Sequence, residues 1–240
     1  HVQQDTTWSV SDFPVAAPVA RFTYASEATT TVYGYVGDSG RSTRQVDQYS
    51  AGEQGGEQYG LLTRSEIYDE GNVRQRIAVT AYVVNPAQWV IVPRLEATYS
   101  GDGQSLGSAT FMFYDGQNDN DNQQIAIGKL TATQVHNRTI QGTCPATEAT
   151  VDTLYGWDDY GNQTSVTTFA GYGVARCSNG NWLAGAITGG GSTAYTTDTS
   201  YDTTYHLYPI QSCSPVIDGD TGSLCTYTNY YGVNPGTIAG

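Results

Sequence analysis

Two acidic loops present closely spaced carboxylates, which is the chemistry that binds calcium. Asp115, Asp119 and Asp121 lie in one polar stretch, and Asp218 and Asp220 lie in another. Hard oxygen ligands at alternating positions suit Ca²⁺, but neither loop is followed by the bidentate glutamate of an EF-hand. The alternative is a pair of solvated acidic loops. The sequence therefore predicts no obligatory cofactor and leaves structural calcium open at these five aspartates.

The first residue, His1, is a candidate copper ligand. A free N-terminal histidine can bind copper through its amine and its ring, together with a second histidine and an axial tyrosine, as in lytic polysaccharide monooxygenases. His136 and His206 are the available second histidines, and Tyr205 and Tyr208 flank His206. No other stretch resembles that family. The alternative is that His1 marks a processing boundary.

Two short motifs imitate the catalytic loops of proteases. Asp38-Ser39-Gly40 and Asp220-Thr221-Gly222 have the form of aspartic-protease loops, in which two carboxylates share a proton in a buried cleft. Each aspartate is preceded here by a glycine instead of an apolar strand. Gly37-Asp38-Ser39-Gly40 also resembles the nucleophile loop of a serine protease, but no histidine and aspartate context supports a catalytic triad. We therefore expect two β-turns at these positions, and we assign no residue to catalysis.

The tryptophans divide into candidate ligand-binding and structural residues. Trp8 and Trp182 are candidates for stacking on sugar rings, because an indole offers a flat apolar face with a polar edge. Trp89 lies in an apolar run and is expected in the core. Trp157 occupies the aromatic position of a repeated dipeptide and is expected to be structural. Glycan binding through Trp8 and Trp182 is therefore one possible function.

The composition excludes several classes of partner. The formal net charge is −13, from 10 Lys and Arg against 23 Asp and Glu. Nucleic acids and anionic membrane surfaces are bound through clustered basic side chains, so neither is expected as a partner. No apolar run approaches the ~20 residues that a membrane-spanning helix needs. These properties predict an extracellular or cell-surface protein.

The cysteines predict disulfide bonds. There are four, and none forms a CxxC pair, which argues against a zinc cluster. They are Cys144, Cys177, Cys213 and Cys225. An even number in an acidic, lysine-poor chain suggests two disulfides formed in an oxidising compartment. Three connectivities are possible. The short loops that they close favour Cys213–Cys225 and Cys144–Cys177.

Two sequons for N-linked glycosylation begin at Asn137 and Asn162. In a secreted eukaryotic protein each asparagine would be a candidate acceptor. In a bacterial protein the same tripeptides would usually carry no meaning. The sequence does not distinguish these two cases.

Alternating apolar and polar residues indicate that strands dominate the fold. The alternation begins at Arg21 and recurs at residues 31–36 and 61–68. Gly and Asn between such segments supply turns, and no stretch keeps helical periodicity with start and stop signals. The sequence therefore predicts an all-β domain over residues 21–240. An irregular arm or edge strand is expected over residues 1–20.

A loose internal repeat runs through this domain. An aromatic residue followed by aspartate recurs about 44 residues apart. The four steps are Tyr68-Asp69, Tyr114-Asp115, Trp157-Asp158 and Tyr201-Asp202. Such self-similarity indicates repeated supersecondary units, each unable to bury its apolar face alone. Within a step, the aspartate is expected to hydrogen-bond the amides of the following turn.

Three longer segments around these steps resemble RHS/YD repeats. They are Tyr59–Asp69, Tyr155–Val166 and Tyr201–Ile210, and the similarity extends over roughly residues 55 to 235. The resemblance is to the YD-repeat regions of large bacterial secreted or cell-surface proteins. It implies many short antiparallel strands in a sheet that spirals into a shell or barrel. Family shells are usually much longer, and no Asp-Pro-Xaa-Gly motif ends these repeats, so enclosure of a toxin is not implied.

The function expected from this resemblance is structural. Unpaired sheet edges recruit further strands, and head-to-tail contacts that do not close produce filaments. We therefore expect a building block of a shell or surface filament that self-associates through strand edges. The alternatives are a carbohydrate-binding or adhesive module, with glycans as partners, and a copper-dependent polysaccharide monooxygenase that uses His1.

Overall fold

A computed structural model describes most of the chain. The described residues are 2–12, 21–33, 40–51, 58–120, 122–136, 148–178, 181–183, 187, 191–215 and 222–230. These ranges contain strands and turns and no α-helix. Within them, no helix is long and apolar enough to cross a membrane.

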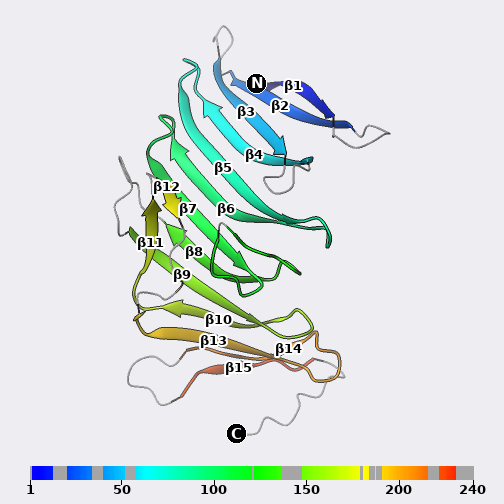
Figure 1. Cartoon of the computed structure of the whole chain (residues 1–240), viewed down its shortest axis with the longest axis vertical. Helices are drawn as coiled ribbons and strands as arrows, with labels where there is room; N and C mark the ends of the chain where they lie inside the picture. Colours follow the sequence, from blue (N-terminus) through cyan, green and yellow to red (C-terminus); the bar gives the residue numbers. More distant parts are fainter. Residues whose placement is uncertain are drawn as a thin grey trace. The chain divides into compact units, whose positions relative to one another are not determined.

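Fifteen strands make up the sheet in the part of the chain that the structure describes (Figure 1). They are β1 (Val2–Asp12), β2 (Arg21–Val32), β3 (Arg41–Ala51), β4 (Gln58–Tyr68), β5 (Arg74–Asn85), β6 (Val90–Ser100), β7 (Leu106–Tyr114), β8 (Leu130–His136), β9 (Glu148–Trp157), β10 (Gln163–Phe169), β11 (Gly173–Ser178), β12 (Asn181–Leu183), β13 (Ala194–Tyr201), β14 (Pro209–Cys213) and β15 (Cys225–Tyr227). The prediction of an all-β fold with many short strands is confirmed.

The strand order follows the order of the chain almost without exception. It runs β1-β2-β3-β4-β5-β6-β7-β8-β9-β10-β13-β14-β15, and β11 pairs with β9 and β12. The pairings described are antiparallel, as consecutive hairpins require. The order has two ends, at β1 and β15, so the pairing is that of an open sheet.

The chain divides into two compact units within this order. Unit 1 contains β1 to β6, β7 as far as Phe111, and residues 122–128. Unit 2 contains the end of β7 from Met112, residues 113–120 and strands β8 to β15. Each unit has its own buried side chains, and each is considered by itself below.

Both units bury apolar and polar side chains, and the buried polar side chains of unit 1 include Glu66 and Gln123. The buried apolar side chains of unit 1 are Ile77, Val83, Val84, Ala97, Leu106, Ala109, Phe111 and Ile125. Those of unit 2 are Met112, Phe113, Tyr114, Ala132 and Ile210. Unit 2 also buries polar side chains, among them Gln134, His136, Thr150 and Asp152. The period-two alternation that defines a strand is clear in β8, where every second residue from Ala132 is buried.

One core prediction is wrong. Trp89 was expected inside, but its side chain is 82% exposed. It lies in the turn between β5 and β6, where its amide donates to the Pro86 carbonyl and its φ is +55°. The apolar run is therefore interrupted by a turn just before Val90. The left-handed backbone at Trp89 directs the ring away from the sheet, whereas the residues that follow it pair with β5.

Candidate functional site at the aspartate turns

The repeated aromatic-aspartate dipeptide has one structural role throughout the chain. Tyr68, Tyr114, Trp157 and Tyr201 are the last residues of β4, β7, β9 and β13. The aspartate that follows each of them is therefore the first residue of the turn. This position suits aspartate, because its short side chain can accept hydrogen bonds from amides further along the turn.

Asp202 has the most extensive set of these bonds. Its Oδ1 accepts from the backbone amides of Leu207 and Tyr208 at 3.0 and 2.9 Å. Its Oδ2 accepts from the amides of Thr204 and Tyr205 at 3.2 and 2.5 Å. The residue is only 1% exposed. A single carboxylate therefore organises the whole connection between β13 and β14.

The turns after β9 and β4 repeat this arrangement on a smaller scale. Asp158 Oδ1 accepts from the amides of Tyr160 and Asn162 at 2.9 and 2.8 Å, and its Oδ2 accepts from Asn162 Nδ2 at 2.8 Å. In unit 1, Asp69 Oδ1 accepts from the amides of Gly71 and Val73 at 3.0 and 2.9 Å. The expectation that these aspartates bond turn amides is confirmed.

Asp115 uses its carboxylate differently. Its Oδ1 accepts from the amide of Lys129 at 2.8 Å, and its own amide donates to the Lys129 carbonyl at 2.8 Å. Its φ is +54°, a left-handed conformation that aspartate tolerates better than most residues. The bonds join the end of β7 to the start of β8 across the intervening loop. This carboxylate thus has a structural partner.

The amide bonds shift the acidity of the turn aspartates. Burial alone would raise the pKa of Asp202, but the backbone amides of Tyr208, Tyr205, Leu207 and Thr204 favour the charged form and lower the pKa from 3.8 to about 2. Burial likewise opposes the downward shift at Asp158, where bonds from Asn162 outweigh it and lower the pKa. Both side chains are therefore carboxylates at neutral pH, as their roles as acceptors require.

We predict that Asp202→Ala lowers the midpoint of thermal unfolding by about 5 °C or more, because four amides lose their acceptor. Since the folded pKa lies below the unfolded value, the stabilisation is present above pH 3.8 and is lost as the pH falls toward about 2. The difference between variant and wild type should shrink over that interval. Thermal unfolding followed by circular dichroism at several pH values measures it. Asp198→Ala, at an exposed position of β13, is the control. Equal effects of both changes would contradict the prediction.

Three of these turns lie side by side in unit 2. Lys129, next to the Asp115 turn, donates from Nζ to the Asp158 carbonyl at 3.2 Å. Asn162, in the Asp158 turn, donates from Nδ2 to the His206 carbonyl at 2.7 Å. The two turns that this second bond joins are adjacent in Figure 1, between β9 and β10 and between β13 and β14. We call the turns that begin at Asp115, Asp158 and Asp202 the turn row.

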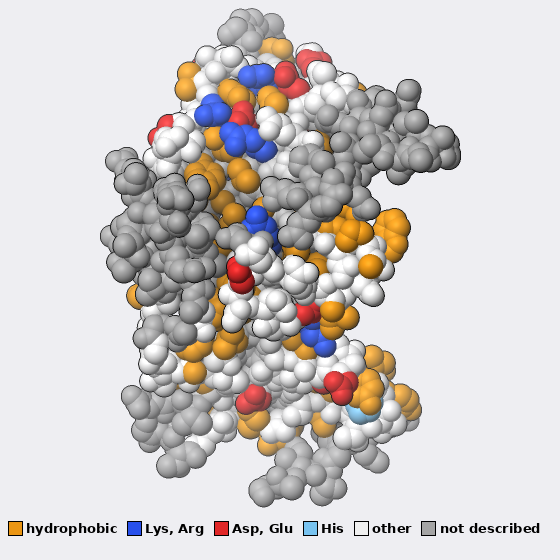
Figure 2. Space-filling model, viewed as in Figure 1, with side chains coloured by type: hydrophobic (Ala, Val, Ile, Leu, Met, Phe, Trp, Pro, Cys, Tyr) orange, Lys and Arg blue, Asp and Glu red, His pale blue; other side chains and the backbone are white. Residues whose placement is uncertain are grey.

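Aromatic side chains extend from the turn row. The rings of Tyr160 and His206 are stacked, with centroids 3.8 Å apart and planes at 7°. Tyr205 and Tyr208 meet edge to face at 6.3 Å, and Tyr208 packs against Tyr230 at 5.0 Å. Figure 2 shows a histidine side chain, in pale blue, among hydrophobic side chains in the lower part of the view.

Two of the five calcium candidates, Asp115 and Asp119, lie among the described residues. Asp115 accepts hydrogen bonds within the turn row, and Asp119 is exposed. Asp121, Asp218 and Asp220 lie outside the described residues. Among the residues that the structure describes, no group of three or more acidic, histidine or cysteine side chains could hold a metal ion. Structural calcium remains a prediction.

The copper and sugar candidates are described only in part. His1 lies outside the described residues, His136 is buried in β8, and His206 lies in the Asp202 turn. Trp8 is 65% exposed on β1, as a stacking residue requires. Trp182 lies in β12, and its side chain falls outside the description. The two tryptophan candidates remain predictions.

The remaining aromatic and sequon residues have structural partners where they are described. Trp157 is half-buried and donates from Nε1 to the Leu130 carbonyl at 2.7 Å. Asn162 donates from its side-chain amide to both Asp158 and His206, which favours a structural role over glycosylation. Asn137 lies outside the described residues.

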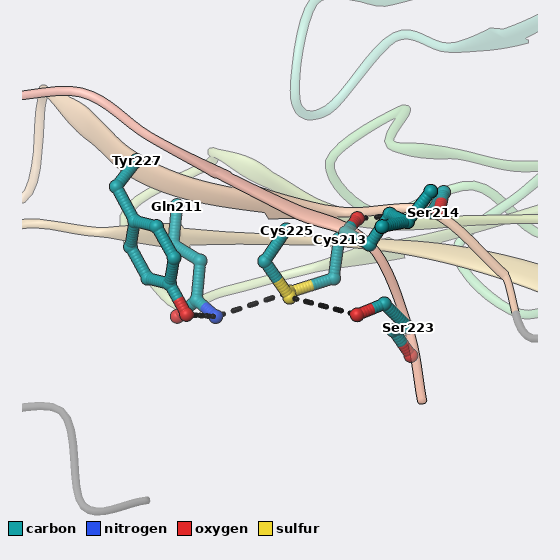
Figure 3. The surroundings of a disulfide bond; sticks show 7 residues. Gln211, Cys213, Ser214, Ser223, Cys225 and Tyr227 are labelled. Carbon is teal, nitrogen blue, oxygen red and sulfur yellow. Dashed lines mark hydrogen bonds between the residues drawn. A yellow bond between two sulfur atoms is a disulfide. The ribbon is translucent and has the colours of Figure 1, made fainter. Parts of the chain in front are cut away.

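One disulfide is described, and it is one of the two favoured by the sequence. Cys213 of β14 and Cys225 of β15 face each other in register and are bonded (Figure 3). Gln211 Nε2 lies 3.1 Å from Cys213 Sγ. Cys144 and the side chain of Cys177 lie outside the described part of the chain, so their pairing remains a prediction.

Sequence reasoning missed a charged cluster in unit 1. Glu66 is 6% exposed, and its Oε1 lies 2.6 Å from Arg64 and 3.1 Å from Arg74. The Tyr68 hydroxyl donates to its Oε2, and the Arg44 guanidinium lies 4.2 Å from the centre of the Tyr68 ring. Figure 2 shows basic and acidic side chains together in the upper part of the view. The spacing of residues 64, 66 and 68 on one strand face was the signal that could have revealed the cluster.

Burial alone would raise the pKa of Glu66, but the Tyr68 hydroxyl and the two arginines outweigh it and lower the pKa. The carboxylate is thus paired on both oxygens. Only the carboxylate is buried, because the side chains of Arg64 and Arg74 are 32% and 31% exposed. Removing either arginine would leave this buried charge with less compensation. This chemistry suits a fixed structural junction across β4 and β5.

A second missed cluster lies in unit 2, between β8 and β9. The buried Asp152 accepts from Gln134 Nε2 at 3.1 Å and from Thr150 Oγ1 at 2.9 Å. A Cβ atom at Gly173 would lie 2.1 Å from Asp152 Oδ2, so the backbone of β11 closely approaches this carboxylate. The signal in the sequence that could have revealed this cluster was the spacing of polar residues at alternate positions, Gln134 and His136 in β8 and Thr150 and Asp152 in β9. The sequence does not show that these side chains are buried, because burial depends on the segments that cover the sheet.

Comparisons with protein-family models, curated proteins and solved structures find no match to this chain.

Proposed function

We propose that this chain is an extracellular structural module built from YD-type repeats. The observation that carries the proposal is the common position of the aromatic-aspartate steps, each of which ends a strand and begins a turn. The strands also pair almost entirely with their neighbours in sequence. A sheet made in this way is a scaffold of similar units, which is the expected architecture of a shell or surface filament.

The disulfide supports the extracellular part of the proposal. Bonds such as Cys213–Cys225 persist in oxidising compartments and are rare in reducing ones. The net charge of −13 favours solubility in such a setting. Polar Thr and Ser along the strands, together with few charged residues overall, suit a surface that meets water without binding polyanions.

The ends of the strand order supply a means of self-association. β1 is eleven residues long and is the first strand in the order. Its sequence contains neither the lysine nor the proline that natural proteins often place on edge strands. The side chains described in β1 are almost all exposed. Pairing of this edge with a strand of another copy would extend the sheet and produce a linear assembly.

Sedimentation velocity over a range of concentrations tests this proposal. Wild-type protein should form concentration-dependent oligomers. The backbone amides of successive strand residues point to opposite edges of β1. Of the two variants Gln4→Pro and Asp5→Pro, one therefore removes an amide that points to the free edge of β1, which we call the outward variant. The other removes an amide that faces β2 and disrupts the pairing of the two strands. We expect the outward variant to stay monomeric with an unchanged circular dichroism spectrum, and Gln4→Ala and Asp5→Ala to assemble normally. A wild-type protein that remains monomeric at every concentration would refute self-association.

A further inference from the structure

The aromatic side chains of the turn row form an exposed surface on unit 2. Tyr160 is 65% exposed, Tyr205 59%, Leu207 67% and Tyr208 39%. With His206 they occupy two neighbouring turns, which the bond from Asn162 to the His206 carbonyl joins. We call these five residues the aromatic turn surface. Exposed rings gathered in this way are typical of a binding site, because isolated exposed rings are ordinary and clustered ones are not.

Hydrogen bonds hold this surface in place without a ligand. Tyr160 donates its amide to Asp158, whereas Tyr205, Leu207 and Tyr208 donate theirs to Asp202. Stacking on Tyr160 restrains the ring of His206. The amide bonds fix the backbone that carries the rings, and the contacts of Tyr160 with His206 and of Tyr205 with Tyr208 restrain the rings themselves, which lowers the entropic cost of binding.

The chemistry of the surface favours a neutral carbohydrate. A sugar ring has an apolar face of C–H groups and a rim of hydroxyls. The tyrosines offer flat apolar faces beside hydroxyl groups, and a tyrosine ring is stiff enough to bind at low entropic cost. The neighbouring strands β10 and β13 are rich in threonine and serine, which exchange hydrogen bonds with hydroxyls.

The acidic charge beside the aromatic turn surface and the small number of its residues argue against an anionic ligand and against a large protein partner. Asp158 and Asp159 lie in the same turn as Tyr160, and Asp159 is exposed, so phosphate or sulfate groups would be repelled. The exposed apolar side chains of this surface lie in the two turns, and Tyr208 also packs against Tyr230, which follows β15. A stable protein interface needs about 800 Å² of each partner, whereas the aromatic turn surface consists of five residues. A short stretch of sugar units matches a surface of this size.

We propose that the aromatic turn surface binds a neutral oligosaccharide through stacking on Tyr160 and Tyr205. The residues of this site do not include Trp8 or Trp182, and all of them belong to unit 2. The inference is independent of self-association through β1. A monomeric protein could bind sugar here, and an assembling protein could fail to do so, so the two proposals stand or fall separately.

Isothermal titration calorimetry with cellohexaose and chitohexaose, two neutral hexasaccharides, tests the site. An oligogalacturonate of the same length is the anionic comparison. We expect saturable binding of at least one neutral hexasaccharide and none of the oligogalacturonate. Tyr160→Ala and Tyr205→Ala should each weaken binding about fivefold or more. Tyr160→Phe, which keeps the ring, should bind within about twofold of wild type.

The matched control is Tyr172→Ala, because Tyr172 is 67% exposed in unit 2 and lies in the turn between β10 and β11. It should bind like wild type. Circular dichroism and thermal unfolding of each variant establish that the fold is retained. Absence of saturable binding to both neutral hexasaccharides would overturn the inference. So would tighter binding of the oligogalacturonate, or equal losses in Tyr172→Ala and Tyr160→Ala.

Discussion

Replacement of Gly101 by alanine is expected to lower the free energy of unfolding by about 3 kcal/mol. Gly101 lies in the turn between β6 and β7, and a Cβ atom there would lie 1.7 Å from the Arg74 carbonyl oxygen and 2.6 Å from its carbonyl carbon. Both atoms belong to the backbone of β5, so no side-chain rotation can relieve the collision. The Gly101 carbonyl also accepts from Arg74 Nε at 2.8 Å, and this bond would be displaced with the turn.

Urea denaturation followed by circular dichroism measures this effect. The matched control is Gly71→Ala in the turn between β4 and β5, where the nearest contacts of an added Cβ are 3.4 and 3.8 Å away. These are ordinary van der Waals distances, so the control should change the free energy of unfolding by less than about 0.5 kcal/mol. Similar stabilities for the two variants would show that β5 can move away from the turn without cost.

Phe113→Ala is expected to be the most damaging change in unit 2, with a loss of about 3–5 kcal/mol. Phe113 is 0% exposed, and its neighbours Met112 and Tyr114 are buried as well. Truncation to alanine removes the contacts of a whole aromatic ring and leaves a cavity that the adjoining strands cannot fill completely. The end of β7 is also the first strand of this unit, so its displacement would affect the pairing with β8.

The same urea denaturation experiment applies to this variant. Phe113→Leu, which keeps most of the volume, should lose less than about 1.5 kcal/mol. Tyr172→Ala removes an aromatic ring of similar size from an exposed position and should be nearly neutral. A loss below about 1 kcal/mol in Phe113→Ala would mean that the core of unit 2 does not depend on this ring.

Much of the fold follows from local patterns in the sequence. Alternation predicted strands correctly where one face of a strand is more buried than the other, as in β8. The turn at residues 160–162 agrees with the expectation that Gly and Asn between strands supply turns, and Gly161 there has a φ of +88°. Trp89 shows where this reasoning fails. A turn can leave an aromatic residue exposed at the start of an apolar run, and composition alone does not reveal which residue takes the left-handed position.

The candidate site was predictable only in its parts. The dipeptide repeat indicated that Asp158 and Asp202 would bond turn amides, because that preference is local. The adjacency of their turns was not predictable, because β10 pairs with β13 and omits the two strands between them. The bond from Asn162 to the His206 carbonyl depends on this pairing and joins residues far apart in sequence. Local chemistry was therefore evident, and its assembly into a surface was not.

The nearest-neighbour strand order has an evolutionary consequence. In a sheet where each strand pairs with those before and after it, a duplicated hairpin can be inserted without rerouting any other connection. The aromatic-aspartate step makes such an insertion self-contained, because the residue that closes the turn travels with the strand that precedes it. Tandem duplication could thus lengthen the chain by small increments while every intermediate stays foldable, and the length of such proteins becomes a trait that selection can adjust.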